Sequence, residues 1–254
     1  MKKLIALILV IASASMCMAG VENINDLKTA KIGVLRGSAT EGFIREFLGE
    51  EKESENISEY DTFADTVRAL KDRKVDAVVM DLAPATYIAS EDKEIKILSE
   101  SFKTEEYGIA FKKDNPLKAE VEKALKELKD EGTIESIFLK YMTDYVDPST
   151  IDYNLNAKNG YLWVGCDASF PPYEMKTAYG FVGADIEMCA AIAKKLDKTL
   201  VVADYAFSML PAALNDGRID MICSAFMISE ERKKTMDFTD SYASEVEAIV
   251  VLNK

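Results

Sequence analysis

Polar side chains that could bind a small charged molecule occur where predicted strands and helices meet. Asp81 follows the apolar strand Val75–Met80, at the carboxyl edge where ligands bind in α/β sheets; the alternative is a cap for the next helix. Ser38 and Thr40 follow Gly37 at the start of another predicted helix, where backbone N–H groups favour anions. An acidic group and an anion-binding turn are therefore candidate parts of a ligand site.

The chain contains no histidine, so it can build neither a serine–histidine pair nor a histidine metal site. Beyond the first twenty residues its cysteines are Cys166, Cys189 and Cys223, whose spacing fits no zinc motif. We expect buried thiols. The alternative is a disulfide between Cys166 and Cys223, which both end predicted strands. We predict no metal and no cofactor.

One supersecondary pattern occurs twice and predicts the scaffold. In both Phe63–Val79 and Phe207–Cys223, a Leu follows the Phe by seven positions, an Asp follows that Leu by six, and an apolar strand comes next. Each unit is typical of a short helix, a polar turn and a buried strand. A further strand precedes each unit, Lys31–Val34 or Leu162–Gly165. The sequence therefore predicts two similar α/β lobes with a cleft between them.

A predicted helical pair separates the two copies. Pro116 opens its first helix, Gly132 ends that helix, and Thr133 caps the second. The preceding segment Tyr107–Lys112 has a strand pattern, and Asp144–Gly160, rich in Asp, Asn, Pro and Ser, predicts a linker.

The first nineteen residues are typical of a secretory signal peptide. Two lysines precede the apolar run Leu4–Ala14, and cleavage could follow Ala14 or Ala19. A lipid anchor at Cys17 is an alternative that the bulky Met16 disfavours. No later segment approaches about 18 consecutive apolar residues, so we expect a soluble, periplasmic or otherwise extracytoplasmic mature chain.

The composition excludes some partners. With 48% hydrophobic residues the chain has the composition of a globular protein, and its formal net charge is −13. Such a surface repels nucleic acid and anionic lipid, so neither is an expected partner.

Fragments of the chain resemble a family of two-lobed proteins, the polar amino-acid solute-binding proteins of bacterial ABC importers (family 3 extracellular solute-binding proteins, with the type II periplasmic-binding-protein fold). The fragments similar to the first lobe of that family are Leu162–Glu174 (LWVGCDASFPPYE), Gly183–Leu196 (GADIEMCAAIAKKL) and Ile228–Asp237 (ISEERKKTMD). Those similar to its second lobe are Lys31–Phe43 (KIGVLRGSATEGF), Val75–Asp81 (VDAVVMD), Tyr107–Phe111 (YGIAF) and the closing helix Gly132–Met142 (GTIESIFLKYM).

The resemblance implies mixed, mostly parallel sheets flanked by helices in each lobe, but in an inverted order. We predict a signal peptide at 1–19, the family's second lobe at 20–108, and a hinge strand plus the family's first lobe at 109–254. The linker 144–160 would join the family's usual C- and N-termini, as in a circular permutation. We expect a monomer; the alternative is a fragment of a tandem duplication that forms a swapped dimer. Tyr107–Lys112 would be the only continuous crossing between the lobes, and Glu247–Lys254 would be the second strand, ending free near Val21. This arrangement predicts a looser hinge than in an unpermuted relative.

The same resemblance implies roles for the charged and hydroxyl-bearing residues. Arg232 corresponds to the residue that binds the carboxylate of a free amino acid; from its pattern alone it could be a surface residue of a charged helix start. Asp81 corresponds to the partner of the ammonium group. Ser38 and Thr40 lie in the turn that closes on the ligand, and Asp167 could meet a polar or cationic side-chain tip.

Other positions would shape the pocket. Phe170 and Phe207 correspond to the two aromatic residues that sandwich the ligand side chain, and Leu35 would line the second-lobe wall. Ala225 would contribute only a backbone carbonyl. Met227 departs from the Ser or Thr usual in the family, at a cost of about 1.5–3 kcal/mol for a lost charge-assisted hydrogen bond. Asp185, which also opens a helix, is interpreted as a structural cap.

These assignments predict a binding protein, not an enzyme. It would capture a polar or basic L-amino acid as the lobes close and deliver it to the membrane permease of an ABC importer. One alternative is a ligand-sensing subunit of a receptor, whose site would be identical. The other is an enzyme similar to cyclohexadienyl dehydratase, in which an Asp or Glu would act as general acid.

Overall fold

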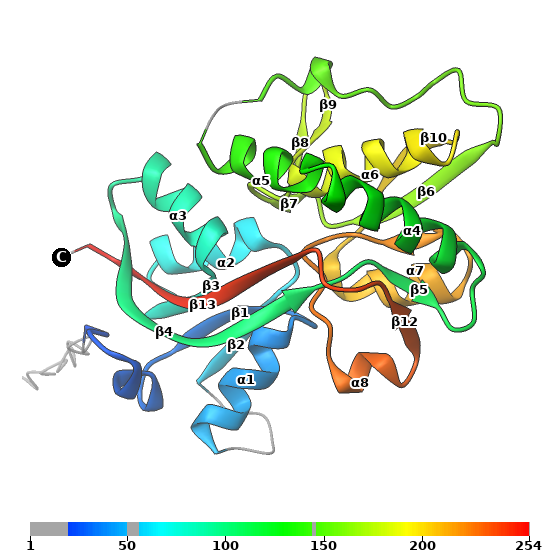
Figure 1. Cartoon of the computed structure of the whole chain (residues 1–254). Helices are drawn as coiled ribbons and strands as arrows, with labels where there is room; N and C mark the ends of the chain where they lie inside the picture. The colour runs from blue at the N-terminus through cyan, green and yellow to red at the C-terminus, as the bar shows by residue number, and fades with distance from the viewer. Residues whose placement is uncertain (1–19, 50–55, 144–145, 254) are drawn as a thin grey trace, which may run out of the picture.

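The computed structural model describes residues 20–49, 56–143 and 146–253, with the side chains of 99–102 excepted. The predicted signal peptide and Cys17 lie outside these residues. The described chain forms two α/β lobes, each built on a five-stranded sheet (Figure 1). Within the described ranges, no helix combines the length and the apolar character needed to cross a bilayer.

The first sheet has the strand order β2-β1-β3-β13-β4. Strands β1, β2 and β3 run parallel, and β13 runs antiparallel to its two neighbours, β3 and β4. These strands are β1 (Ile32–Leu35), β2 (Ile57–Tyr60), β3 (Ala77–Asp81), β4 (Ile95–Tyr107) and β13 (Ala243–Leu252).

The second sheet repeats this plan with the order β10-β6-β11-β5-β12. Three parallel strands are again followed by an antiparallel one, β5, and by a fifth strand that pairs with it. These strands are β5 (Ala110–Lys112), β6 (Tyr161–Cys166), β10 (Thr199–Asp204), β11 (Met221–Ile222) and β12 (Met236–Phe238). A small third sheet consists of β7 (Ser169–Phe170), β8 (Glu174–Thr177) and β9 (Gly180–Val182).

Helices follow the strands as the sequence pattern predicts. The first lobe carries α1 (Ala39–Leu48), α2 (Phe63–Lys71), α3 (Leu82–Glu91) and the 3-10 turn η1 (Ile24–Lys28). The second carries α4 (Leu117–Asp130), α5 (Thr133–Thr143), α6 (Ala184–Lys195), α7 (Leu210–Asn215), α8 (Glu230–Lys233), and the turns η2 (Pro148–Thr150) and η3 (Phe207–Met209). Side-chain oxygens of Ser38 and Thr62 accept from backbone N–H groups of the first turns of α1 and α2, which fixes where these helices begin.

Both faces of the first sheet are buried, because successive side chains of a strand point to opposite faces. Ala77 and Val79 of β3 pack in one apolar cluster with Ile44 of α1. Val78 and Met80 pack in the other, with Phe63 of α2. This two-sided burial explains why the strand is a continuous apolar run, and it places Asp81 at the exit of a fixed strand.

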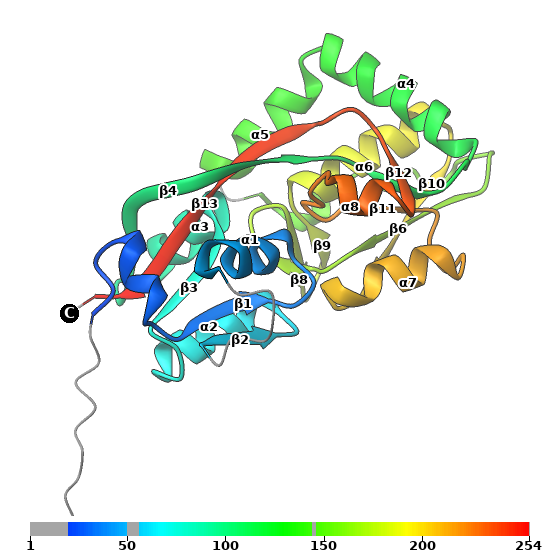
Figure 2. The same ribbon diagram turned by 90° about the horizontal axis from the view of Figure 1, so that it is seen from below.

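The chain crosses between the two sheets twice. One crossing runs from β4 into β5, and the other from β12 into β13; the backbone N–H of Tyr242 donates to the carbonyl of Tyr107 at 2.9 Å between them. Strands β4 and β13 pair antiparallel, and Figure 2 shows both running from the first lobe toward the second and crossing in that view. The expectation of a single continuous crossing is therefore wrong, and the prediction of a loose hinge loses its basis.

The predicted boundary at residue 109 also misplaces β13. That strand lies between β3 and β4 in the first sheet, not with the second lobe. Its residues Ala248 and Val250 pack into one core cluster, and Ile249 and Val251 into the other. A strand that is apolar on both faces requires a central position, whereas the sequence interpretation followed chain order.

The described part of the predicted linker, from residue 146 onward, is anchored on the second lobe. The hydroxyl of Tyr153 donates to the carbonyl of Phe181 at 2.8 Å. The backbone N–H of Leu200 donates to the carbonyl of Tyr153 at 3.0 Å, and that of Thr199 to the carbonyl of Gly160 at 2.8 Å. The segment therefore extends the edge of the second sheet beside β10.

Candidate functional site

A cavity of about 40 Å³ lies between the two lobes. All ten residues predicted to form the ligand site line it: Leu35, Ser38, Thr40, Asp81, Asp167, Phe170, Phe207, Ala225, Met227 and Arg232. This volume has room for about three water molecules. The structure thus brings the predicted residues together around one small enclosed space, while their roles toward a ligand stay predictions.

Arg232 enters this cavity from α8 of the second lobe. Its guanidinium donates through Nη1 to the carbonyl of Met227 at 2.8 Å and through Nη2 to the carbonyl of Gly37 at 3.0 Å. The second bond reaches the first lobe. The guanidinium also lies 3.9 Å from the ring centroid of Phe226. Burial lowers its pKa to about 10, against the raising effect of the Glu105 charge, so the group stays cationic at neutral pH.

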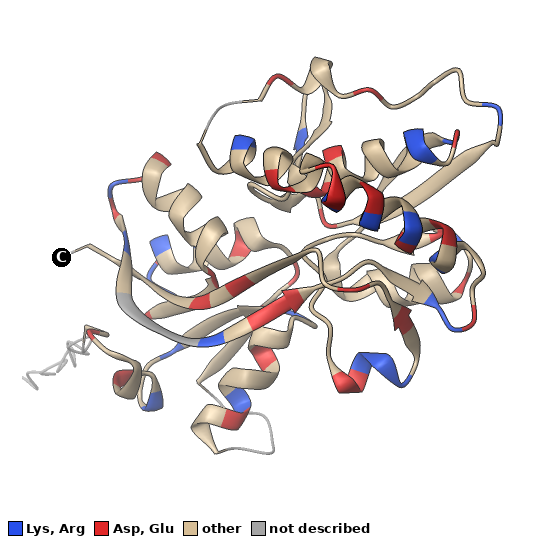
Figure 3. Cartoon of the chain, in the orientation of Figure 1, with Lys and Arg blue, Asp and Glu red and all other residues tan. Residues whose placement is uncertain are grey.

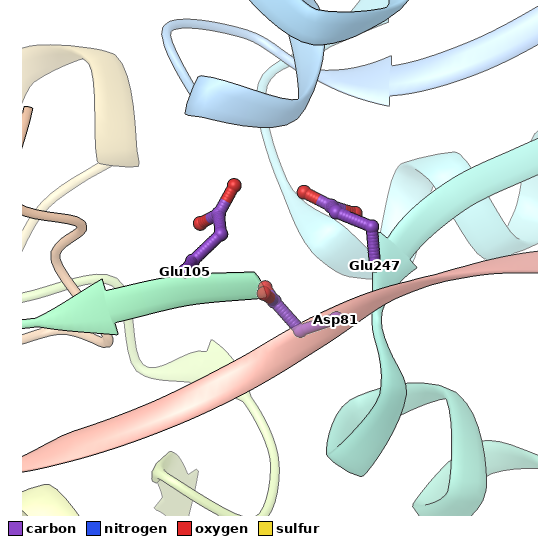
Figure 4. A group of neighbouring side chains, drawn as sticks. All are labelled: Asp81, Glu105 and Glu247. Carbon is purple, nitrogen blue, oxygen red and sulfur yellow. The ribbon is translucent and has the colours of Figure 1, made fainter. Parts of the chain in front are cut away.

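Three carboxyl groups of the first lobe lie close together (Figure 4). Asp81 and Glu105 line the cavity, and Glu247 is their neighbour. Asp81 ends β3, Glu105 lies on β4 and Glu247 on β13, so each of three neighbouring strands supplies one. One oxygen from each lies within 4.8 Å of those of the other two. Figure 3 shows the acidic segments of β4 and β13 side by side near the middle of the molecule.

These three carboxyl groups are buried and poorly paired. Asp81 is 8% exposed, Glu105 5% and Glu247 0%. The hydroxyl of Thr40 donates to Oε1 of Glu247 at 2.5 Å. Asp81 Oδ1, Glu105 Oε1 and Glu247 Oε2 have no hydrogen-bond partner among the described residues. Asp81 occupies the cap position of α3 without any side-chain cap hydrogen bond, so the helix-cap alternative does not explain it.

Burial raises the pKa values of all three groups, and repulsion between carboxylates adds to the rise for Asp81 and Glu247. Burial raises the pKa of Asp81 to about 8, and the negative charge of Glu105 adds to the rise. Burial also raises the pKa of Glu105 and, with the charge of Asp81, raises that of Glu247 well above its usual range. The cluster therefore retains protons at neutral pH unless a cation enters it.

Aromatic rings form the apolar walls. Phe170 meets the ring of Phe63 edge-on at a centroid separation of 5.2 Å, and Phe207 packs on Phe226 at 5.4 Å. Between the two predicted rings lies Asp167, whose oxygens accept from the Ser169 hydroxyl at 2.6 Å and the Phe207 backbone N–H at 3.2 Å. Burial raises the pKa of Asp167, and these donors oppose the rise.

The remaining predicted residues have structural partners of their own. Ser38 caps α1, and its Oγ accepts from the backbone N–H of Glu41 at 3.3 Å. The backbone N–H of Ala225 donates to Asp185 at 2.8 Å. This bond does not involve the Ala225 carbonyl, which was predicted to face the ligand. Met227 contributes its carbonyl to Arg232, and its side chain lines the cavity.

Asp185 is not the cap of α6. Its helix is capped by Gly183, and the carboxylate of Asp185 instead accepts from the Ala225 N–H and the Tyr242 hydroxyl, each at 2.8 Å. The interpretation as a cap is therefore wrong, because the side chain points into the lobe rather than back along its own helix. Cys166, Cys189 and Cys223 are free and buried.

Sequence reasoning missed eight residues that line or complete the site: Ala39, Phe63, Thr66, Val79, Met80, Glu105, Ser224 and Glu247. The signal for Glu247 was present, since it begins the apolar run EAIVVL at a position where a charge is unusual. Glu105 gave no such signal, because it lies in a polar stretch and its burial depends on the long pairing of β4 with β13.

Comparisons with known proteins show that part of this chain is similar to a known family. Residues 162–254 match the bacterial extracellular solute-binding proteins, family 3. The chain is 37% identical over 81 residues to an arginine-binding extracellular protein of Bacillus subtilis, which covers 32% of each protein. It is 32% identical over 130 residues to an ABC transporter glutamine-binding protein of the same species, which covers 51% of this chain and 45% of the relative.

Among solved structures, an ancestral arginine-binding protein bound to glutamine is 42% identical over 33% of this chain and 37% of its own, with a TM-score of 0.31. The chain thus spans only about a third to just under a half of the length of these two Bacillus subtilis relatives. The predicted resemblance to family 3 solute-binding proteins is confirmed, and the family match falls on the segment that was predicted to resemble the first lobe.

Proposed function

We propose that this chain is an extracytoplasmic solute-binding protein that captures a free polar or basic L-amino acid and delivers it to an ABC importer. One observation carries the proposal. A guanidinium from the second lobe and a group of carboxyls from the first lobe line the same enclosed cavity. A zwitterion has the complementary charges, and burying either charge without a partner is costly.

Arg232 is the proposed partner of the ligand carboxylate. Its two terminal nitrogens now donate to Met227 in its own lobe and to Gly37 in the other lobe. A carboxylate that accepts two parallel N–H bonds would take over the contact with Gly37. The lobes must separate to admit it, because the present cavity holds only about three waters. Capture therefore proceeds from an open form.

The side-chain end of the ligand would lie between Phe170 and Phe207, near Asp167. Two aromatic faces and a carboxylate suit a basic side chain through stacking and charge, and they also accept an amide. Relatives of the matched segment are named as arginine-, histidine- and glutamine-binding proteins, which supports the same range. Met227 replaces a hydroxyl expected in this family, so we predict a weaker hold on the carboxylate end.

We further infer that the lobe order results from a circular permutation. The segment that matches the family model occupies residues 162–254, while the strands with the second-lobe pattern precede it. The anchored segment from residue 146 to residue 160 joins α5 to β6 along the second lobe. A variant whose present N- and C-termini are joined, and whose chain is opened between residues 146 and 160, should keep the same melting behaviour.

One observation favours a second candidate function, a dehydratase. Asp81 keeps its proton near neutral pH, and a protonated carboxylic acid beside a ligand can act as a general acid. Turnover of prephenate or arogenate by the purified protein would establish this alternative. A ligand-sensing role would leave the site unchanged and would be identified by a receptor partner instead of a permease.

A thermal-shift screen of the mature chain against the twenty amino acids tests the proposal. A ligand at 100 times its dissociation constant should stabilise the fold by about 2.7 kcal/mol. Arg232→Ala should abolish the response to every amino acid, whereas Lys233→Ala, the exposed neighbour on the same helix, should leave it unchanged. An Arg232→Ala protein that responds like the wild type would overturn the carboxylate assignment.

A further inference from the structure

We propose that Glu105 and Glu247 complete, with Asp81, a three-carboxylate cradle for a primary ammonium group, and that the site therefore selects ligands that carry a free primary amine and a net positive charge. This inference rests on the proposed function and deepens it. It adds two residues to the ammonium site and narrows the ligand class to cationic amino acids.

The three carboxyl groups of the cradle lie close enough together to be reached by the donors of one ammonium group. Such a group carries three N–H donors in a tetrahedral arrangement. Hydrogen bonds of about 2.8 Å along those directions separate their acceptors by about 4.6 Å. One oxygen each of Asp81, Glu105 and Glu247 lies within 4.8 Å of the others (Figure 4). Each N–H can therefore meet a different carboxylate.

The hydrogen bonding of the cradle is incomplete without a ligand. Among the residues that the structure describes, an oxygen of each cradle carboxyl lacks a hydrogen-bond partner although all three side chains are more than nine-tenths buried. Thr40 supplies a single donor, to Glu247. Buried carboxylates need a cation, several donors or a proton. A protonated amine would provide both the charge and the three donors.

The charge of the cavity favours a ligand with more positive than negative groups. The described lining residues include three carboxyl groups, on Asp81, Glu105 and Asp167, and a single cation, Arg232. Glu247 adds a fourth carboxyl immediately behind them. A neutral zwitterion leaves this excess of carboxyl groups over cations unchanged, whereas the net positive charge of lysine or arginine offsets one carboxylate. Binding a cationic ligand should also release protons from the cradle, since its carboxyl groups must ionise to accept.

A divalent metal ion is the other cation that carboxylates hold, but the cradle suits an amine better. Ca²⁺ takes six to eight oxygen ligands, and the walls beside the cradle include the rings of Phe63 and Phe170. An ammonium group is satisfied by three acceptors, and the carbon atoms attached to it would lie against these rings.

Calorimetric titration of the full chain with L-lysine and L-arginine at pH 7.5 tests the cradle. Glu105→Gln and Glu247→Gln should each weaken binding about tenfold, the effect of one charge-assisted hydrogen bond. Glu106→Gln changes the exposed neighbour on the same strand and should bind as the wild type does. Titration in two buffers of different ionisation enthalpy should show proton release by the wild type and less by either cradle variant.

The outcomes separate the two proposals. If no amino acid binds the wild-type chain, the proposed function fails and the cradle with it. If lysine binds but both cradle variants bind it equally well, Asp81 alone holds the amine and the cradle is refuted while the function stands. If Mn²⁺ alone binds the wild type and Glu247→Gln abolishes that binding, the cluster is a metal site instead.

Discussion

Two groups of buried carboxyls, one in each lobe, are chemically alike and differently paired. In the second lobe, Asp185 accepts from the Ala225 N–H and the Tyr242 hydroxyl at 2.8 Å each, and Glu174 accepts from the Ser224 hydroxyl at 2.7 Å. In the first lobe, the cradle of Asp81, Glu105 and Glu247 accepts one such side-chain bond, from Thr40. Burial is similar in the two groups, and among the described residues each carboxyl keeps one oxygen without a partner. The groups differ in the number of donors, three for the two second-lobe carboxyls and one for the three of the cradle.

The pKa values of Asp185 and Asp81 express this difference, whereas burial and the Asp185 charge raise the pKa of Glu174 well above its usual range. Burial raises the pKa of Asp185 to about 6, and the bonds from Ala225 and Tyr242 limit the rise. Burial raises the pKa of Asp81 to about 8, and the negative charge of Glu105 adds to the rise. Donors that the protein itself supplies thus mark Asp185 as structural. The first-lobe carboxyls have the donor deficit expected of a binding site before its ligand arrives.

Asp185→Ala should cause the largest loss of stability. It removes the acceptor of two buried donors, the Ala225 N–H and the Tyr242 hydroxyl, and each unpaired donor costs about 1–3 kcal/mol. We expect the free energy of unfolding to fall by about 3 kcal/mol in urea titrations. A loss no greater than that caused by Asp81→Ala would contradict the structural role of the second-lobe group.

Glu247→Gln should instead increase the free energy of unfolding of the ligand-free protein. It removes one of three repelling carboxyls while its amide oxygen can still accept from Thr40. We expect about 1 kcal/mol of added stability at pH 8, where repulsion within the cradle is strongest. Urea unfolding of the variant and the wild type at that pH measures the effect, and a clear destabilisation would show that Glu247 is structural.

The stability of the ligand-free chain should fall as the pH rises from about 4 to about 8. Unfolded carboxyls titrate near pH 4, whereas the folded cradle keeps its protons to higher pH. The folded state therefore binds more protons in this window, and the free energy of unfolding decreases with pH. Affinity for lysine should rise over the same window, because binding requires the ionised cradle.

Other groups that face the cradle set the size of this effect. Four of these groups lie on strands or helices of the first lobe: Lys103 and Tyr107 on β4, Glu245 on β13 and Thr40 on α1. The other two are Tyr173, in the loop before β8, and Arg232 on α8. Stability curves of the wild type and of Glu105→Gln between pH 4 and pH 9 test the assignment. A variant curve as steep as that of the wild type would place the titrating groups elsewhere.

Tyr242→Phe should give the smallest effect and make the two groups more alike. It removes one of the two donors to Asp185, at a cost of about 1 kcal/mol in stability. The pKa of Asp185 should move upward, toward that of Asp81. Carboxyl titration by NMR reads this shift directly, and an unchanged pKa would mean that the Ala225 N–H alone controls it.

Local pattern was enough to predict most of the scaffold. The repeated units give α2 with β3 and η3 with α7 and β11, because apolar spacing and polar turns act over short stretches. The ten lining residues came from resemblance to a family, and all ten meet at one cavity. Glu105 and Asp185 escaped prediction for a common reason. Their burial and partners depend on strands and helices that are distant in sequence, which periodicity cannot report.

The central place of β13 constrains the order in which the protein can fold. Every strand of the second sheet precedes Ala243 in the chain, so that sheet can assemble as soon as β12 has emerged. Strands β3 and β4 are synthesised much earlier, yet they touch only through β13. Until it arrives, the first lobe is left with two unjoined sheet edges, the kind of surface on which newly made chains aggregate. A chaperone that shields these edges would protect the lobe completed last.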